Sequence, residues 1–266
     1  MDLKLSQKMI KTNNIITNLI KRNLMGIKVS FEDEGADFVD VSFLKTFCDR
    51  NNIPLTLKIG GAEAIRDIKD ANRLQITKIV SPMIESTFAL EKFIKSSEIY
   101  YNVNGGILGI NLESIQAYEN LETIFSFQMI NKLSSVTGGR GDLVQSLNMD
   151  RYGRMVDSDK IFEITRDIFE NCRNHNLECT LGGSMTVESK DFVNSLISEN
   201  LLDKFETRNV IVDCESLKYH SFEDVIESTL DFELNYLKFR TEYYTKLIEQ
   251  DKVRIKRMDK LKFNKV

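Results

Sequence analysis

The sequence predicts an α/β protein, a (β/α) TIM-type barrel with a long C-terminal helical extension. Three observations lead to this fold: short apolar segments alternate with helical patterns, the 266 residues suit one barrel, and the stretch from Phe222 to Leu261 has no proline or glycine. Alternating strands and helices favour a parallel sheet, and at this length a closed barrel is favoured over an open sheet. We therefore expect a barrel domain over residues 1–221 and a helical extension over residues 222–266, packed on the barrel or on a neighbouring subunit.

Seven apolar segments have the length and composition of strands. In chain order they read IKVSF, LTLKI, KIVSPMI, ILGINL, LSSVT, ECTL and NVIVD. The pattern does not show the eighth strand of a full barrel. That strand is irregular, lies in the IITNLI segment near Ile15, or is absent.

Helical patterns separate these segments. Apolar residues recur at steps of three and four, and each such stripe would pack a helix against the sheet. The stripes are Phe38, Val41, Leu44 and Cys48, then Ile65, Ile68 and Ala71, then Ile161, Ile164, Ile168 and Cys172.

The C-terminal extension carries a further apolar stripe. Its members, which share one helical face, are Ile226, Leu230, Leu234, Leu237, Tyr244 and Ile248. The stripe predicts one long helix or two shorter ones. Two arrangements remain open: the extension covers its own barrel, or it crosses to a neighbour and builds a homo-oligomer. The basic end, Lys252 through Lys265, is typical of a solvated terminus.

Composition narrows the class of protein. The 36 basic and 40 acidic residues give a net charge of -4, and the basic residues are dispersed except near the C-terminus, which argues against a nucleic-acid partner. The four cysteines are far apart and form no CxxC pair, as expected for reduced thiols in the cytoplasm. The N-terminus lacks the apolar core of a signal peptide, and no run of about 18 apolar residues exists to span a membrane. We expect a cytoplasmic protein that acts on a small molecule.

Two carboxylates mark the candidate site. Glu113 and Asp142 each end an apolar, strand-like run, in the segments GILGINLES and LSSVTGGRGDL. Acids at the ends of consecutive strands can meet at one mouth of a barrel and hold a divalent cation. Along the first run, Gly109, Asn111 and Glu113 share a face. Oxygen ligands alone favour Mg²⁺ or Mn²⁺ over zinc, with water completing the shell.

Two earlier strands also carry charges. Their polar faces hold Lys28, Ser30 and Glu32 in the first and Thr56, Lys58 and Gly60 in the second. If the apolar faces pack on helices, these polar faces point into the barrel. An unpaired charge there is costly, so Lys28 and Lys58 should meet carboxylates such as Glu32, Glu85 or Glu113. Such ion pairs either fill the barrel or form part of a site.

Glycine pairs lie near the same strand ends. Gly60-Gly61, Gly138-Gly139 and Gly182-Gly183 each follow or end a strand. Glycine there lets the backbone approach a ligand closely. None of the pairs forms a GxGxxG or Walker motif, so nucleotide binding has little support.

Several segments follow one another in a distinctive order: KIGGAEAIRDI, KIVSPMIES, GINLES and GGRGDLVQSLNMD, followed by a closing strand. The order of these segments resembles the HpcH/HpaI aldolase and citrate lyase β-subunit family of the phosphoenolpyruvate/pyruvate-type barrel superfamily. The resemblance covers roughly Gly26 to Asp213. It implies a modified (β/α) barrel that binds a divalent metal, usually magnesium. It also implies a lyase that makes or breaks carbon–carbon bonds through a metal-stabilised enolate of a pyruvate-like acid or a thioester.

The resemblance also implies roles for individual residues. Glu113 and Asp142 match the metal-binding acids of the family. Asn111 matches a polar residue beside the bound oxo acid. The backbone N–H groups of Gly141 and Asp142 match those that hold the carboxylate of the substrate.

The sequence departs from the family at two positions. Lys58 stands where the family commonly has an arginine, and a lysine cannot grip a carboxylate bidentately. We expect Lys58 to bind substrate or stabilise the enolate. Gly35 stands at or near the position where the pyruvate aldolases carry a histidine, so the usual base is missing.

Several acids are candidates for the missing base. Glu32, Glu34 and Glu85 remain, and we name Glu32 and Glu85 with Lys58 as the catalytic residues. His175 and His220 are no evident replacements, because one lies in a helical pattern and the other in a late loop.

The first functional prediction is a Mg²⁺- or Mn²⁺-dependent lyase acting on a 2-oxo acid, such as a 2-keto-3-deoxy sugar acid. A lyase or hydrolase of acyl-CoA thioesters is an alternative. An aldolase that uses Lys58 as a Schiff-base nucleophile is another. The last alternative is a barrel protein that binds a ligand but catalyses no reaction. The missing histidine and the substituted arginine favour this alternative, and the two retained carboxylates argue against it.

Overall fold

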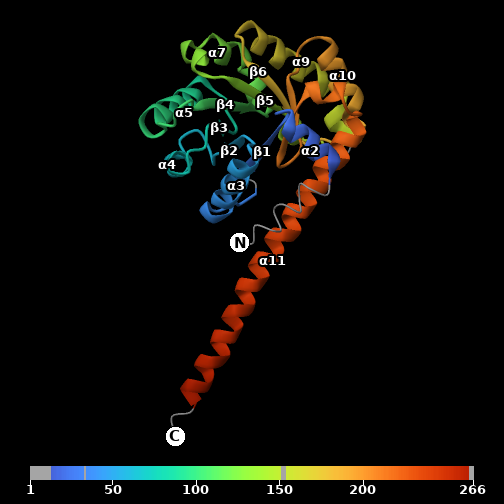
Figure 1. The fold of residues 1–266 in the computed structure, drawn as a ribbon. Helices are drawn as coiled ribbons and strands as arrows, with labels where there is room; N and C mark the ends of the chain where they lie inside the picture. Colours follow the sequence, from blue (N-terminus) through green and yellow to red (C-terminus); the bar gives the residue numbers. More distant parts are fainter. Residues whose placement is uncertain (1–12, 33, 151–153, 264–266) are drawn as a thin grey trace.

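The computed structural model describes residues 13–32, 34–150 and 154–263, and in this part of the chain eight strands close into a barrel (Figure 1). Helices surround the barrel, which confirms the predicted α/β barrel. The strands are β1 Met25–Ser30, β2 Leu55–Lys58, β3 Lys78–Ser81, β4 Ile107–Leu112, β5 Ser135–Gly139, β6 Glu178–Gly182, β7 Lys204–Glu206 and β8 Val210–Asp213.

Helices connect the strands and form the outer layer. The α-helices are α2 Asn14–Lys21, α3 Phe38–Asn51, α4 Ile65–Arg73, α5 Thr87–Tyr100, α6 Ile115–Glu119, α7 Leu121–Ser126, α8 Arg140–Ser146, α9 Asp159–Asn174, α10 Lys190–Ser198 and α11 Phe222–Phe263. Short 3-10 helices are η1 Gln128–Lys132, η2 Arg154–Asp157, η3 Val187–Ser189 and η4 Cys214–Lys218. No helix within the described residues has the length and apolar character needed to cross a membrane.

The sheet departs from the predicted parallel arrangement at its last strand. Strands β1 to β6 each pair in parallel with the next strand along the chain, but β8 pairs antiparallel with both β7 and β1. The reason is the connection: only residues 207–209 join β7 to β8, and so short a link permits only a hairpin. The turn therefore lies at the end of the barrel where the parallel strands finish.

The strand missing from the sequence pattern is β7. It has three residues, Lys204–Glu206, which is too short for an apolar alternation to register. The IITNLI segment is not a strand but part of helix α2. The Asn13 side chain caps that helix by accepting hydrogen bonds from the N–H groups of Ile15 and Ile16, at 3.0 and 3.1 Å.

The predicted helical stripes pack against the barrel. Val41 of α3, Ile68 of α4 and Ile164 of α9 are buried in the layer between helices and strands. Two stripe residues at helix starts are not buried: Phe38 of α3 remains 41% exposed, and Ile65 of α4 is half-buried. The main core of the protein is this layer, and the barrel interior is left to polar side chains.

Helix α11 is one continuous helix of 42 residues that first packs on the barrel and then extends away from it (Figure 1). Its barrel side contains Phe232, which lies near Phe47, and Phe239, which stacks on Phe43 of α3 with ring centroids 4.8 Å apart. Of the predicted stripe, Ile226 is buried. Leu234 and Leu237 of the stripe are 48% and 47% exposed, so the aromatic face, not the predicted stripe, anchors this helix.

Candidate active site

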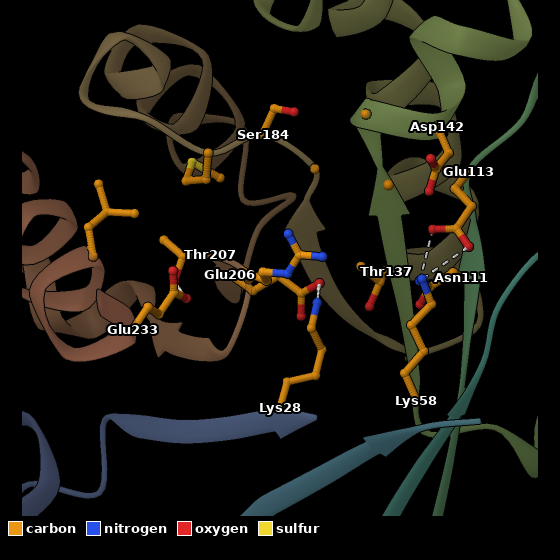
Figure 2. Close-up of a pocket in the computed structure, with 16 residues that line it drawn as sticks. Lys28, Lys58, Asn111, Glu113, Thr137, Asp142, Ser184, Glu206, Thr207 and Glu233 are labelled. Atoms are coloured by element: carbon orange, nitrogen blue, oxygen red, sulfur yellow. Dashed lines mark hydrogen bonds and ion pairs between the residues drawn. The ribbon is translucent and has the colours of Figure 1, made fainter. Parts of the chain in front are cut away.

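A cavity of about 470 Å³ opens at the end of the barrel where the parallel strands finish. We call it the mouth cavity. Its lining comes from most of the barrel strands, the β7–β8 turn, the start of α8 and the first part of α11 (Figure 2). Polar and charged side chains predominate in it, as the alternation of the strands predicted.

The two predicted acids line one wall of the mouth cavity. Glu113 follows β4 directly and is 3% exposed, and Asp142 lies in the first turn of α8 and is half-buried. Figure 2 shows the two carboxylates next to each other. The amide of Asn111 donates to Glu113 Oε2 at 2.9 Å, and the backbone N–H of Met83 donates to Glu113 Oε1 at 3.2 Å. These bonds fix the orientation of the Glu113 carboxylate.

Gly139 makes room for Glu113. A Cβ atom at Gly139 would lie 2.5 Å from Glu113 Oε2 and 2.6 Å from Glu113 Cβ. Any larger residue at the end of β5 would displace the carboxylate. Gly139 therefore leaves space for the acid, whereas a Cβ at Gly138 would instead meet the ring of Phe169, 3.2 Å away.

The two acids place negative charge close together in a partly buried site. Burial raises the pKa of Glu113, and the negative charge of Asp142 raises it further, while Lys58 and the hydrogen bonds from Asn111 and Met83 lower it. Two carboxylates are hard oxygen donors that suit Mg²⁺ or Mn²⁺. The described part of the chain holds no cluster of three or more His, Cys, Asp or Glu suited to a metal. A cation here would take its remaining ligands from water or substrate.

Lys58 lies beside this pair of acids. Its ammonium group is 2.8 Å from Glu32 Oε2 and 3.9 Å from Glu113 Oε1, and the residue is buried. This confirms that Lys58 meets carboxylates inside the barrel. Glu32 is held at the edge of the site by this ion pair, although it does not itself line the mouth cavity.

The other candidate bases lie farther out. Glu85 accepts a hydrogen bond from the Ser114 hydroxyl at 2.6 Å and does not line the mouth cavity. Glu34 accepts from the Asn209 amide at 2.7 Å. Gly35, with φ of 55°, has open space around it.

Neither histidine reaches the mouth cavity. His175 Nδ1 is 2.9 Å from the Asn171 carbonyl oxygen in α9. His220 Nε2 is 3.3 Å from Asn18 Oδ1. Both are absent from the lining.

A second ion pair faces the acids across the mouth cavity (Figure 2). Lys28 of β1 pairs with Glu206 of β7, not with the carboxylates expected from the sequence. Glu206 is 5% exposed. Gly182 gives it space, because a Cβ there would lie 2.8 Å from Glu206 Oε1. The partner of Lys28 escaped sequence reasoning because it is on the strand that the pattern did not reveal.

Helix α11 supplies two further lining residues, Leu230 and Glu233. Glu233 is buried and accepts hydrogen bonds from the Thr207 hydroxyl and the Asn209 backbone N–H, both at 2.6 Å. Glu233 thereby ties the β7–β8 turn to α11. The only signal for this contact in the sequence is a charged residue on the barrel side of an amphipathic helix.

Arg140 fixes the backbone next to Asp142. It is fully buried, pairs with Asp157, and donates to the carbonyl oxygens of Gly182 and Gly183 at 3.3 and 3.1 Å. Gly183 has φ of 84°, and a Cβ on it would lie 2.3 Å from the backbone nitrogen of Gly141. The start of α8 is thus held tightly against the end of β6, and both Gly141 and Asp142 line the mouth cavity.

The fold has solved neighbours. The HpcH/HpaI aldolase from Desulfitobacterium hafniense DCB-2 superimposes with a TM-score of 0.54 at 11% identity, over 68% of this chain and 77% of that chain. The citrate synthase SbnG gives a TM-score of 0.55 at 15% identity, over 81% of this chain and 84% of that chain. An HpcH/HpaI aldolase/citrate lyase family protein from Burkholderia cenocepacia J2315 gives 0.52 at 11% identity, over 63% and 74%.

These neighbours confirm, at the level of the fold, the resemblance seen in the sequence. No protein-family profile matches the chain, and the comparison with curated proteins gives no significant sequence match. At 11–15% identity the neighbours establish the architecture alone.

Proposed function

We propose that the protein is an aldolase-like lyase that cleaves or forms a carbon–carbon bond in a 2-oxo acid at the mouth cavity, with Mg²⁺ or Mn²⁺ as cofactor. The observation that carries this proposal is the pair of carboxylates, Glu113 and Asp142, on one wall of a polar cavity with a buried lysine beside them. The fold neighbours named as aldolases and citrate synthase support the reaction class.

Glu113 and Asp142 would hold the cation. A bound divalent cation would supply positive charge where the 2-oxo acid gains negative charge as the bond breaks. Asn111 would keep the Glu113 carboxylate turned toward the cation, because its amide already donates to Glu113 Oε2. Within the described residues these two acids would be the protein ligands, which leaves coordination positions for the substrate.

Lys58 would bind the acid group of the substrate and stabilise negative charge beside it. Its ammonium group is buried and lies within 4 Å of Glu113, so it acts at short range in a site of low dielectric constant. A Schiff-base role fits this geometry less well, since an ammonium paired with Glu32 and Glu113 lacks the free electron pair of a nucleophile.

Glu32 is our candidate for the group that accepts or returns a proton. Neither Glu32 nor Glu85 lines the mouth cavity, but Glu32 is ion-paired at 2.8 Å with Lys58, which does line it. Glu85 is instead hydrogen-bonded to Ser114, which does not. Geometry comes before basicity in choosing a general base. Glu32→Gln should therefore lower turnover more than Glu85→Gln does.

The test is pyruvate release from a panel of 2-keto-3-deoxy sugar acids in the presence of Mg²⁺, followed with lactate dehydrogenase and NADH. We expect release by the wild type and a loss of at least 100-fold, about 2.7 kcal/mol, in Glu113→Gln. Glu119→Gln is the matched control, because Glu119 is exposed on α6. Equal release by Glu113→Gln and wild type would refute the assigned site, and no release from any member of the panel would refute the substrate class.

A further inference from the structure

Helix α11 carries an apolar repeat that the barrel does not use. Starting at Leu230, positions separated alternately by four and three residues form one stripe, as in a heptad repeat. These positions are Leu230, Leu234, Leu237, Thr241, Tyr244, Ile248, Asp251, Ile255, Met258 and Lys262. Seven of the ten are apolar or aromatic, and a period of 3.5 is the pattern of a left-handed coiled coil.

The stripe is exposed to solvent along the helix, except at Tyr244, which is half-buried. Leu230, Leu234 and Leu237 are 44–48% exposed, while Ile255 and Met258 are 59% and 70% exposed. The opposite face stacks on α3 through Phe239, and contact with α3 ends at Tyr244, a stripe residue whose hydroxyl donates to Asp40. From residue 245 to residue 262 every side chain is exposed. A helix that projects alone with such a stripe leaves a large apolar surface in water.

We propose that this stripe packs against the same stripe of a second copy of the chain. The two α11 helices would then form a parallel, two-stranded coiled coil. Most of the stripe lies opposite the face that carries Phe232 and Phe239, so a two-fold axis along it keeps the two barrels on the outside. A two-fold pair brings the same surface of each copy together, so one repeat serves both chains.

The charges beside the stripe favour the parallel orientation. In a parallel pair, a flanking residue meets the flanking residue five positions further on in the other helix, which places Arg254 next to Asp259 of the second copy. An antiparallel pair of full overlap would instead place Asp231 against Asp259, and Lys238 against Lys252, all of which flank the same side of the stripe. The parallel arrangement brings opposite charges together and the antiparallel arrangement brings like charges together, so the charges favour the parallel one.

The area of the stripe suits a stable pair. Burying an apolar side chain contributes about 2 kcal/mol of transfer free energy, which corresponds to roughly 80 Å². If each of the seven apolar or aromatic side chains buries this area, the two chains together bury on the order of 1,100 Å². Flanking Leu247 and Leu261, which are 40% and 74% exposed, add to this. Specific protein interfaces begin at about 1,200 Å², so the two helices alone supply most of what is needed.

Polar residues within the stripe limit the affinity. Asp251 lies at a core position, and Arg254 of the same helix donates to it at 2.8 Å and offsets its charge. Polar core residues lower the stability of a coiled coil and help to specify its register. Asp251→Leu should therefore strengthen the pair at least tenfold.

The repeat also begins at the candidate site. Leu230 is both the first residue of the stripe and part of the lining of the mouth cavity. In a parallel pair, Leu230 of the second copy would lie next to it, so the rims of the two cavities would adjoin. This arrangement does not depend on the proposed function.

The first test is the molar mass of the purified full chain, measured by light scattering across a range of concentrations. We expect the mass of two chains for the wild type and of one chain for Ile255→Asp. Val253→Asp is the matched control: Val253 is also β-branched and 56% exposed, but it lies on the opposite side of the helix. A monomeric wild type, or an oligomer that Ile255→Asp leaves intact, would overturn the proposal.

The second test concerns orientation. Met258→Cys in a parallel pair places two thiols together, so mild oxidation should link the chains by a disulfide, whereas Val253→Cys should stay unlinked. The wild type, whose own cysteines lie outside α11, gives the background. An oligomer in which Met258→Cys fails to cross-link would contradict the parallel orientation.

Discussion

Gly139→Ala is a small change with a large expected effect on the candidate site. The added methyl group would lie 2.5 Å from Glu113 Oε2 and 2.6 Å from Glu113 Cβ, whereas carbon atoms normally approach to about 3.5 Å or more. The carboxylate could rotate away, but the Glu113 Cβ is fixed to the end of β4 and cannot. The backbone between β4 and β5 must therefore shift.

The size of the effect follows from the two contacts. Overpacking of this kind costs about 1–3 kcal/mol of folding free energy. Displacing the carboxylate would also weaken its hydrogen bond with Asn111, now 2.9 Å, and separate Glu113 from Asp142. We expect Mn²⁺ affinity to fall at least tenfold, which corresponds to about 1.4 kcal/mol.

Two measurements on Gly139→Ala separate these effects. Urea unfolding gives the loss of stability, and titration calorimetry with Mn²⁺ gives the loss of cation affinity, with Glu113→Gln as the reference for a destroyed site. Gly26→Ala is the control, because its added methyl group would be 3.4 Å from the nearest atom, the Pro54 carbonyl oxygen. If Gly139→Ala binds Mn²⁺ as tightly as the wild type does, the reasoning about this glycine is refuted.

Two further predictions concern groups away from the cation site. Lys28→Met removes the positive charge beside the buried Glu206 carboxylate, so the free energy of unfolding in urea should fall by about 3 kcal/mol. Adding Glu206→Gln should restore part of that loss. No change in the single variant would contradict the ion pair. Burial raises the pKa values of the Cys48 and Cys172 thiols, so little thiolate forms at pH 8. Both thiols should resist a thiol reagent in the native protein but react at once in urea. Fast labelling of the native protein would contradict their burial.

The sequence predicted the parts of the fold whose signal is local. Apolar runs located seven strands, and stripes such as that around Ile164 located the helices of the outer layer. Strand alternation placed Asn111 and Glu113 on one face, and the structure brings both into the mouth cavity. These features follow from periods of two and 3.6 residues, which a short segment displays by itself.

The parts that the sequence did not predict depend on distant contacts. β7 is three residues long, so it carries no periodic signal, and without it Glu206 could not be placed opposite Lys28. The reversal of β8 follows from the shortness of the turn, which is recognisable only once β7 is known. Glu233 reaches the site because α11 packs across the β7–β8 turn, a contact that no local pattern encodes.

Helix α11 shows a different limit. The stripe that includes Leu234 and Leu237 is correct as a pattern, but a pattern does not say which surface it faces. The barrel binds the aromatic face, with Phe232 and Phe239, because that face stacks on α3. Two apolar faces on one helix indicate two partners, and the sequence does not show which partner belongs to which face.

The central claim is that Glu113 and Asp142 form a cation site at which a 2-oxo acid loses a proton or a carbon–carbon bond. Proton NMR of pyruvate in D₂O tests this most directly, because a bound and polarised keto acid exchanges its methyl protons with solvent. The account predicts that the methyl signal decays slowly with protein and Mg²⁺, since Gly35 stands at or near the position where the resemblance implies a histidine. It also predicts that the signal persists with EDTA or with Glu113→Gln. A methyl signal that decays equally with wild type and Glu113→Gln, or that does not decay with the wild type and Mg²⁺, would contradict the account.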